Sequence, residues 1–178
     1  FINKSKSELV GVCDSDPERI LSVKSLVKEL DSDYPISNLK CFKEYDQLLK
    51  AVKKGNFKLD LIILCTPSGL HSPHAIKAFK SGINVCTEKP MATTWEDGLK
   101  MLNAAEKYKK RLFVVKQNRF NPTLKLLKRQ LEKGRFGKLA LITVNVFWQR
   151  PQSYYNQAEW RGTLNYDGGA LMNQASHY

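Results

Sequence analysis

The sequence lacks any apolar run near the roughly 20 residues that a helix needs to cross a membrane. No apolar signal segment follows its polar start. It has only three histidines and four cysteines, and no cysteine pair has the Cys-x-x-Cys spacing. Cys13, Cys41, Cys65 and Cys86 all lie in apolar, strand-like segments. We therefore expect buried free thiols in a reducing cytoplasm, with neither disulfides nor a metal site.

Acidic residues are also scarce, since 17 Asp and Glu stand against 29 Lys and Arg, a net charge of +12. The lysines are spread along the predicted helices and form no single block. A solvated basic surface is the default interpretation of that distribution, and an anionic small substrate is compatible with it. We expect neither a nucleic-acid partner nor a membrane partner, because no basic recognition element is evident.

Strand and helix signals alternate through the first two thirds of the chain. The predicted strands cover residues 8–13, 39–42, 60–65, 83–86 and 111–115. The predicted helices cover residues 17–30, 44–53, 71–81 and 94–109. Asp16 and Thr94 are the expected N-caps of two of them. This alternation predicts an α/β fold with a doubly wound parallel sheet.

The pattern changes after about residue 118. Asn121-Pro122 opens a predicted helix to Glu132, and a long alternating strand is predicted over 139–148. Period-two alternation fits an open, mainly antiparallel sheet of an α+β domain. We therefore expect a dinucleotide-binding domain over 1–118 and the start of a second domain over 119–178. One strand cannot bury its apolar face and no Gly-x-Gly-x-x-Gly is present, so we expect the chain to be cut at both ends.

The run Glu88-Lys89-Pro90 directly follows an apolar strand. Ligands bind at the carboxyl edge of open parallel sheets, so Glu88 and Lys89 are candidates for contact with a ligand. An X-Pro bond can be cis at little cost, which makes Pro90 a candidate for locking that turn. The run taken alone is equally compatible with an exposed charged pair at a strand end.

Other candidate residues follow other strands. Asp14 ends the first predicted strand, where an acid can bind ribose hydroxyls, although a plain loop aspartate is as common there. Thr66-Pro67 begins a loop that either approaches a ligand or is an ordinary turn. His71 and His74 are better explained as structural or helix-start residues.

Asn173 and His177 are four residues apart and would share one face of a helix. The preceding Gly168-Gly169 permits close approach of the backbone to a ligand. A lone helical histidine is more often structural than catalytic. The residues by themselves therefore leave the role of His177 open.

These motifs together resemble the Gfo/Idh/MocA family of NAD(P)-dependent sugar oxidoreductases. The matching motifs are Val12-Cys13-Asp14, Thr66-Pro67 with His71, Glu88-Lys89-Pro90, Gln117-Asn118-Arg119-Phe120 with Pro122, and Gly168-Gly169-Ala170 leading to His177. Within the family, Trp160-Arg161-Gly162 and residues 167–174 are most similar to the UDP-N-acetylglucosaminuronate 3-dehydrogenases. Such enzymes oxidise a sugar 3-hydroxyl in the synthesis of surface polysaccharides.

The resemblance implies NAD as cofactor, and it assigns roles to individual residues. On the cofactor side it implies Asp14, Thr66, Pro67, His71, Glu88, Lys89 and Gln117. On the substrate side it implies Lys89, Arg119, Asn121, Trp160, Arg161, Asn173 and His177. His177 would be the general base, with Lys89 orienting the hydroxyl or sharing its proton.

Two departures from the family pattern matter. Many family members carry Asp where this chain has Asn173, and an amide cannot act as a base. Without a glycine loop the pyrophosphate has no cradle, so we expect this stretch alone to bind NAD poorly and to be inactive. A non-catalytic sensor or scaffold of the same fold is the alternative function, and a homo-oligomer is the expected assembly.

Overall fold

The computed structural model describes residues 7–177. The chain divides into two compact units, Phe1–Asp60 and Leu61–Tyr178. The domain boundary near residue 118 stays a prediction. Among the described residues, no helix is both long enough and apolar enough to cross a membrane.

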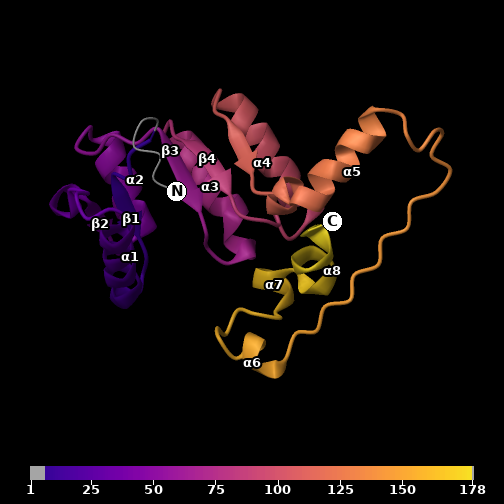
Figure 1. The fold of residues 1–178 in the computed structure, drawn as a ribbon. Helices are drawn as coiled ribbons and strands as arrows, with labels where there is room; N and C mark the ends of the chain where they lie inside the picture. Colours follow the sequence, from indigo (N-terminus) through magenta and orange to yellow (C-terminus); the bar gives the residue numbers. More distant parts are fainter. Residues whose placement is uncertain (1–6, 178) are drawn as a thin grey trace. The chain divides into compact units, whose positions relative to one another are not determined.

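The first unit is a small parallel α/β module (Figure 1). Its elements are β1 (Gly11–Cys13), α1 (Pro17–Leu30), the 3₁₀ helix η1 (Ile36–Asn38), β2 (Lys40–Phe42) and α2 (Tyr45–Lys53). Strands β1 and β2 are parallel, with Val12 opposite Cys41. Asp16 caps α1 as predicted, because its side chain accepts a hydrogen bond from Glu18 N at 2.9 Å.

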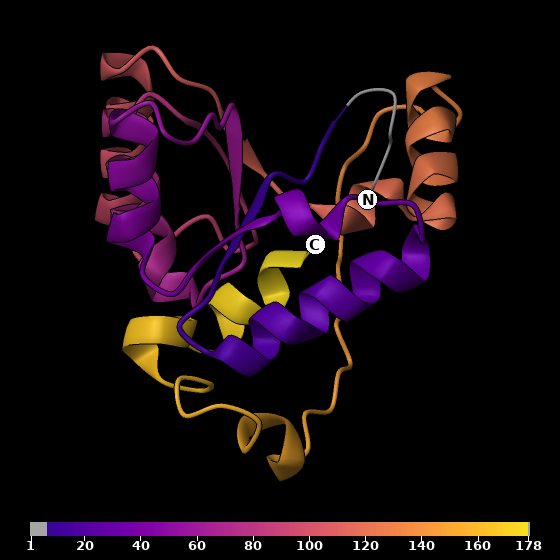
Figure 2. The same ribbon diagram turned by 90° about the vertical axis from the view of Figure 1, so that its left-hand side faces the viewer.

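The second unit contains the larger parallel sheet, in the order β3-β4-β5. Its elements are β3 (Leu61–Leu64), η2 (Ser68–Leu70), α3 (His71–Lys80), β4 (Asn84–Thr87), α4 (Trp95–Lys107) and β5 (Leu112–Val114). Helix α3 packs against α4 and against the sheet, and both helices lie on the same side of it (Figure 2). Phe79, Ile83, Val85 and Met101 form the core there, each at most 1% exposed. The prediction of a parallel α/β fold is therefore confirmed.

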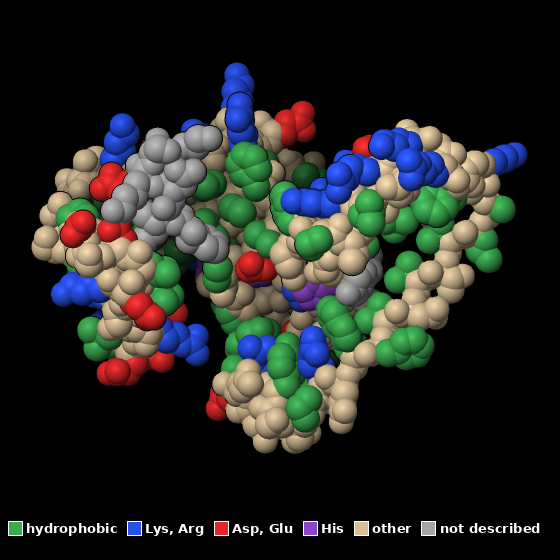
Figure 3. Space-filling model, in the orientation of Figure 1, with side chains coloured by type: hydrophobic (Ala, Val, Ile, Leu, Met, Phe, Trp, Pro, Cys, Tyr) green, Lys and Arg blue, Asp and Glu red, His purple; other side chains and the backbone are tan. Residues whose placement is uncertain are grey.

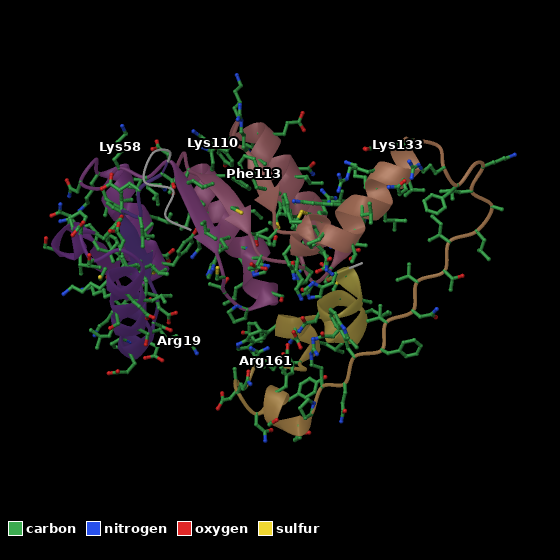
Figure 4. All side chains as sticks on the ribbon, viewed as in Figure 1. Arg19, Lys58, Lys110, Phe113, Lys133 and Arg161 are labelled. Atoms are coloured by element: carbon green, nitrogen blue, oxygen red, sulfur yellow. The ribbon has the colours of Figure 1, made fainter. Side chains whose placement is uncertain are left out.

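The other side of this sheet is less covered. Leu61 and Ile63 on β3 and Phe113 on β5 are 41 to 48% exposed. Of these three, Phe113 is labelled in Figure 4. All four cysteines are free, as predicted, but Cys41 and Cys65 are exposed. The prediction that all four are buried is thus wrong. Among residues 7–177, β2 has β1 as its one partner strand, and Cys65 lies just past the end of β3.

The remainder of the second unit is mostly helical. It consists of η3 (Gln117–Phe120), α5 (Pro122–Glu132), α6 (Gln152–Tyr155), α7 (Leu164–Asp167), α8 (Gly169–Asn173) and η4 (Ala175–His177). Lys and Arg side chains gather along α5 (Figure 3). The predicted strand over 139–148 forms no ladder and runs as a single extended segment between α5 and α6 (Figure 1). A strand needs a hydrogen-bonded neighbour, and the described residues offer none to this segment.

Candidate active site

The Glu88-Lys89-Pro90 run lies directly after the end of β4. Thr87 is fully buried and its carbonyl accepts a hydrogen bond from Val115 N at 2.9 Å, which ties the strand end to β5. Glu88 N donates to Leu64 O at 3.0 Å, and Lys89 N donates to the Glu88 carboxylate at 3.1 Å. The Lys89–Pro90 peptide bond is cis. Glu88 and Lys89 are therefore fixed at the carboxyl edge of the sheet, where their sequence position predicts them.

His71 connects the loops that follow β3 and β4. Its Nδ1 lies 2.8 Å from Pro90 O and its Nε2 lies 2.9 Å from Thr66 O. The ring is 1% exposed. Both ring nitrogens thus face backbone carbonyls. The position explains why a histidine begins α3: it holds two loops together.

Lys89 reaches the C-terminal end of the second unit through Asn173. Lys89 Nζ donates to Asn173 O at 2.6 Å and to Asn173 Oδ1 at 3.0 Å. These two residues are separated by 84 positions in the sequence. Of the three N–H donors of the ammonium, two are used here and one is left for another acceptor.

Asn173 and His177 do not share one continuous helix, so that prediction is wrong. Helix α8 ends at Asn173, and His177 lies in the 3₁₀ turn η4. The tighter turn is visible in the hydrogen bond from His177 N to Gln174 O at 3.4 Å. Asn173 consequently contacts Lys89, whereas His177 contacts the η3 segment.

Two residues at the start of η3 hold His177, and the lysine before them holds the neighbouring Ser176. Gln117 Nε2 lies 2.8 Å from His177 Nδ1, and Asn118 Nδ2 donates to His177 O at 3.3 Å. Lys116 Nζ donates to Ser176 O. The ring of Trp148 meets the imidazole edge-on, with 5.3 Å between the centroids. The imidazole is thus oriented on several sides, with Nδ1 engaged and Nε2 making no hydrogen bond among the described residues.

Positive charge lies around His177, whereas acidic groups lie near Lys89. Partial burial lowers the pKa of His177, and the nearby Lys89, Lys116 and Arg150 lower it further, against a smaller opposite effect of Glu88. Burial also lowers the pKa of Lys89, opposed by Glu88 and Asp167. A neutral imidazole is therefore favoured at physiological pH, and only a neutral imidazole can accept a proton.

Asp167, which the sequence analysis did not select, lies behind this pair. The side chain is only 3% exposed. One carboxylate oxygen accepts from Gly162 N at 2.7 Å, and the other accepts from Asn173 Nδ2. The signal that could have found it is an acid directly before a Gly-Gly pair.

The two glycines following Asp167 have a conformational explanation. Gly168 and Gly169 have φ values of +77° and +79°, in the left-handed region that disfavours other residues. A Cβ on Gly168 would also lie 2.9 Å from the Met172 side chain. The pair therefore allows the sharp turn from α7 into α8, which brings Asn173 to Lys89.

A group of arginine and aromatic side chains lies beside the site. The Arg150 guanidinium lies 5.0 Å from the Trp148 ring centroid and donates to Gln174 Oε1 at 2.7 Å. Arg161, labelled in Figure 4, lies 4.4 Å from the Tyr154 ring and 5.0 Å from the Trp160 ring. The Nε atoms of both arginines are buried without a hydrogen-bond partner. This arginine–aromatic group offers positive charge held by stacking, which suits a planar or anionic ligand.

The candidates for the cofactor side lie in both units. Asp14 follows β1 in the first unit, where its side chain accepts a hydrogen bond from Asp16 N at 3.0 Å. In the second unit, Thr66 Oγ1 is buried without a hydrogen-bond partner at the carboxyl end of β3. An orphaned hydroxyl at that edge fits a polar ligand. Gly69, by contrast, is required by packing, because a Cβ would lie 2.1 Å from Asn165 O.

Arg119 and Asn121, the remaining substrate-side candidates, are exposed. Asn121 caps α5 through its Oδ1, which accepts from Thr123 N at 3.1 Å. Their assignment to the substrate stays a prediction.

A parallel α/β unit with a lysine and a histidine brought together at its carboxyl edge has the architecture of a dinucleotide-dependent oxidoreductase. The chain belongs to the Gfo/Idh/MocA family: the model of the oxidoreductase family with an NAD-binding Rossmann fold matches residues 1–116, and that of the GFO/IDH/MocA C-terminal domain matches residues 124–178. NAD is therefore the cofactor class of the first matched domain.

Two solved structures are similar over nearly the whole chain. The WlbA dehydrogenase from Bordetella pertussis, in complex with NADH and UDP-GlcNAcA, is 44% identical with a TM-score of 0.84 over 98% of this chain and 50% of that one. The WlbA dehydrogenase from Chromobacterium violaceum, in complex with the same two molecules, is 48% identical with a TM-score of 0.82, over 98% of this chain and 46% of that one.

Among curated relatives, the 1-carboxy-3-chloro-3,4-dihydroxycyclo hexa-1,5-diene dehydrogenase of Comamonas testosteroni is 31% identical over 99% of this chain. The chain covers 41% of that protein, and thus spans about half or less of the proteins that it matches.

Proposed function

We propose that the protein containing this chain is an NAD-dependent dehydrogenase that oxidises the 3-hydroxyl of a UDP-N-acetylhexosaminuronate. The observation that carries the proposal is one arrangement of side chains. Lys89 donates hydrogen bonds to Asn173, and His177, four residues further along the chain, lies beside Gln117. The two WlbA structures, crystallised with NADH and UDP-GlcNAcA, support the choice of cofactor and substrate.

His177 is the proposed general base. Its lowered pKa keeps the imidazole neutral, and its Nε2 is not engaged by another described residue. With Gln117 Nε2 facing Nδ1, the amide donates and the imidazole hydrogen is on Nε2. Turning the amide over places Oε1 at Nδ1, moves the hydrogen to Nδ1 and frees Nε2 to accept a proton. In our proposal this second arrangement is the reactive one.

Lys89 is the proposed partner of His177. Its third N–H donor binds the substrate hydroxyl and stabilises the negative charge that develops as His177 removes the proton. Bound NAD supplies the hydride acceptor. Thr66, Glu88, Lys89 and Gln117 would hold it in the second unit, and Asp14 would bind its adenosine ribose.

The charge around the site favours an acidic substrate. Lys89, Lys116 and Arg150 all act on His177 by their positive charge, and Arg161 lies in the adjacent arginine–aromatic group. Glu88 and Asp167 are the acids that oppose this charge at Lys89. A substrate with a diphosphate and a uronate carboxylate complements such a surface.

The experiment is to mix the full-length protein with NAD and UDP-N-acetylglucosaminuronate and to follow NADH absorbance. UDP-N-acetylglucosamine, which lacks the carboxylate, is the matched control substrate. We expect NADH formation with the uronate and much slower formation with the control. Binding of the sugar nucleotide without any NADH formation would contradict the proposal and favour the sensor alternative.

A further inference from the structure

Asp167 is a buried carboxylate whose two oxygens are both engaged by neutral donors. It accepts from Gly162 N at 2.7 Å and from Asn173 Nδ2, and it makes no direct ion pair with the lysines and arginines of the described chain. Burial of a charge is costly unless the charge is compensated. Asp167 acts electrostatically on the ammonium of Lys89, which lies on the far side of the Asn173 amide.

The carboxylate decides which way the Asn173 amide points. A carboxylate only accepts hydrogen bonds and an ammonium only donates them. The NH₂ group of Asn173 must therefore face Asp167, and Oδ1 must face Lys89, as the structure has them. Turning the amide over would set donor against donor at Lys89 and acceptor against acceptor at Asp167.

We propose that Asp167 is a positioning residue of the proposed dehydrogenase: acting through the Asn173 amide, it holds the Lys89 ammonium with one N–H free for the substrate hydroxyl. The proposal rests on the proposed function for the identity of that hydroxyl. Two of the three Lys89 donors are taken by Asn173 O and Oδ1, so their geometry fixes the direction of the third. We call this series Asp167–Asn173–Lys89 the carboxylate–amide–ammonium chain.

A purely structural role has to be separated from this one, because Asp167 also binds Gly162 N and so closes the loop from 162 to 167. The decisive variant exchanges the two side chains: Asp167→Asn with Asn173→Asp. The exchange puts a carboxylate against Lys89 and an amide donor behind it, which keeps a connected chain. Thr163→Val is the matched control, since Thr163 Oγ1 supports the same loop by donating to Trp160 O at 2.7 Å without touching Asn173 or Lys89.

In the full-length enzyme, Asp167→Asn alone should lower kcat about tenfold or more, because the amide loses its fixed orientation and the ammonium its hydrogen bond. Asn173→Asp alone should also lower kcat, because two adjacent carboxylates force one of them to keep a proton. The exchange should recover kcat to within about threefold of wild type, a strongly non-additive result. An exchange variant no better than the worse single variant, or a Thr163→Val variant as impaired as Asp167→Asn, would overturn the proposal.

A second measurement needs no substrate. Acetic anhydride labels only the neutral amine, so the pH dependence of Lys89 labelling, read by mass spectrometry, reports the pKa of its ammonium. Glu88 and Asp167 support the charged form there, while Lys116 and Arg150 oppose it. Asp167→Asn should therefore lower the pKa of Lys89, and the exchange should raise it again. An unchanged labelling profile in Asp167→Asn refutes the link. A shifted profile in a protein that is inactive with every nucleotide sugar supports the link and refutes only the substrate.

Discussion

Replacing His177 with Asn is the most direct test of the proposed chemistry. Asparagine keeps a polar side chain of similar reach beside Gln117 but cannot accept a proton at neutral pH. A positioned general base contributes about a hundredfold to ten-thousandfold to a rate. Because Lys89 stays in place to bind the hydroxyl, we expect the lower end, about a hundredfold loss in kcat, or roughly 2.7 kcal/mol.

The pH profile sharpens this test. The pKa of His177 is lowered from its ordinary value of 6.5 by burial and by Lys89, Lys116 and Arg150. The base form therefore dominates above that value and is lost as the pH falls through the lowered pKa. At about pH 7.5 even an ordinary histidine would be roughly 90% neutral, so kcat/KM should already be on its plateau. The acidic limb should disappear in His177→Asn.

The assay is stopped-flow reduction of NAD by UDP-N-acetylglucosaminuronate in the full-length protein, with equilibrium binding of both ligands measured in parallel. His74→Asn, the same exchange on α3 outside the site, is the matched control and should react at the wild-type rate. Reduction at the wild-type rate in His177→Asn, with its acidic limb intact, would show that the proton goes elsewhere.

Three further outcomes follow from the same residues. If Asp14 binds the adenosine ribose as proposed, its carboxylate would repel a 2′-phosphate there, so the full-length protein should bind NAD more tightly than NADP in a fluorescence titration. Equal or tighter binding of NADP refutes that role. Lys89→Met should raise the KM for the sugar as well as lower kcat, since it removes both the donor and the charge. Steady-state kinetics measure both constants, and a change in neither would show that the hydroxyl binds elsewhere. Gly69→Ala should lower the thermal midpoint by several degrees, because its Cβ would lie 2.1 Å from Asn165 O. Gly55→Ala should cost less, because its Cβ meets nothing within 4 Å and its only strain is the positive φ of +74° at that position.

Local signals in the sequence predict the elements of the parallel sheet well. The caps of α1 and α4 depend on Asp16 and Thr94, each of which binds an amide two or three residues away. The structure of the segment over 139–148 is harder to predict from sequence. Its alternating apolar pattern specifies a strand only when another strand lies beside it. Phe147, on one of its faces, is 91% exposed in the structure.

The candidate site could be predicted only in part for the same reason. Glu88-Lys89-Pro90 and His177 carry recognisable patterns, so the sequence selects them. Asp167 carries only the weak signal of an acid before a Gly-Gly pair, and its contact with Asn173 depends on the turn at Gly168. Lys116 carries no signal, because its contact is with Ser176, 60 positions away in the sequence. Chemistry of single residues is visible in a sequence, whereas the hydrogen bonds that orient them depend on tertiary structure.

The His71 ring, held between Pro90 O and Thr66 O, makes the loops after β3 and β4 mechanically a single piece. A displacement of Thr66 is transmitted through one rigid imidazole to the residue next to Lys89. A substitution that displaces the Thr66 backbone should therefore also shift the loop of Lys89, the lysine proposed to bind the substrate. If Thr66 holds the cofactor as proposed, a change made there to the cofactor contacts will be felt at the sugar as well, and His71 is the connection.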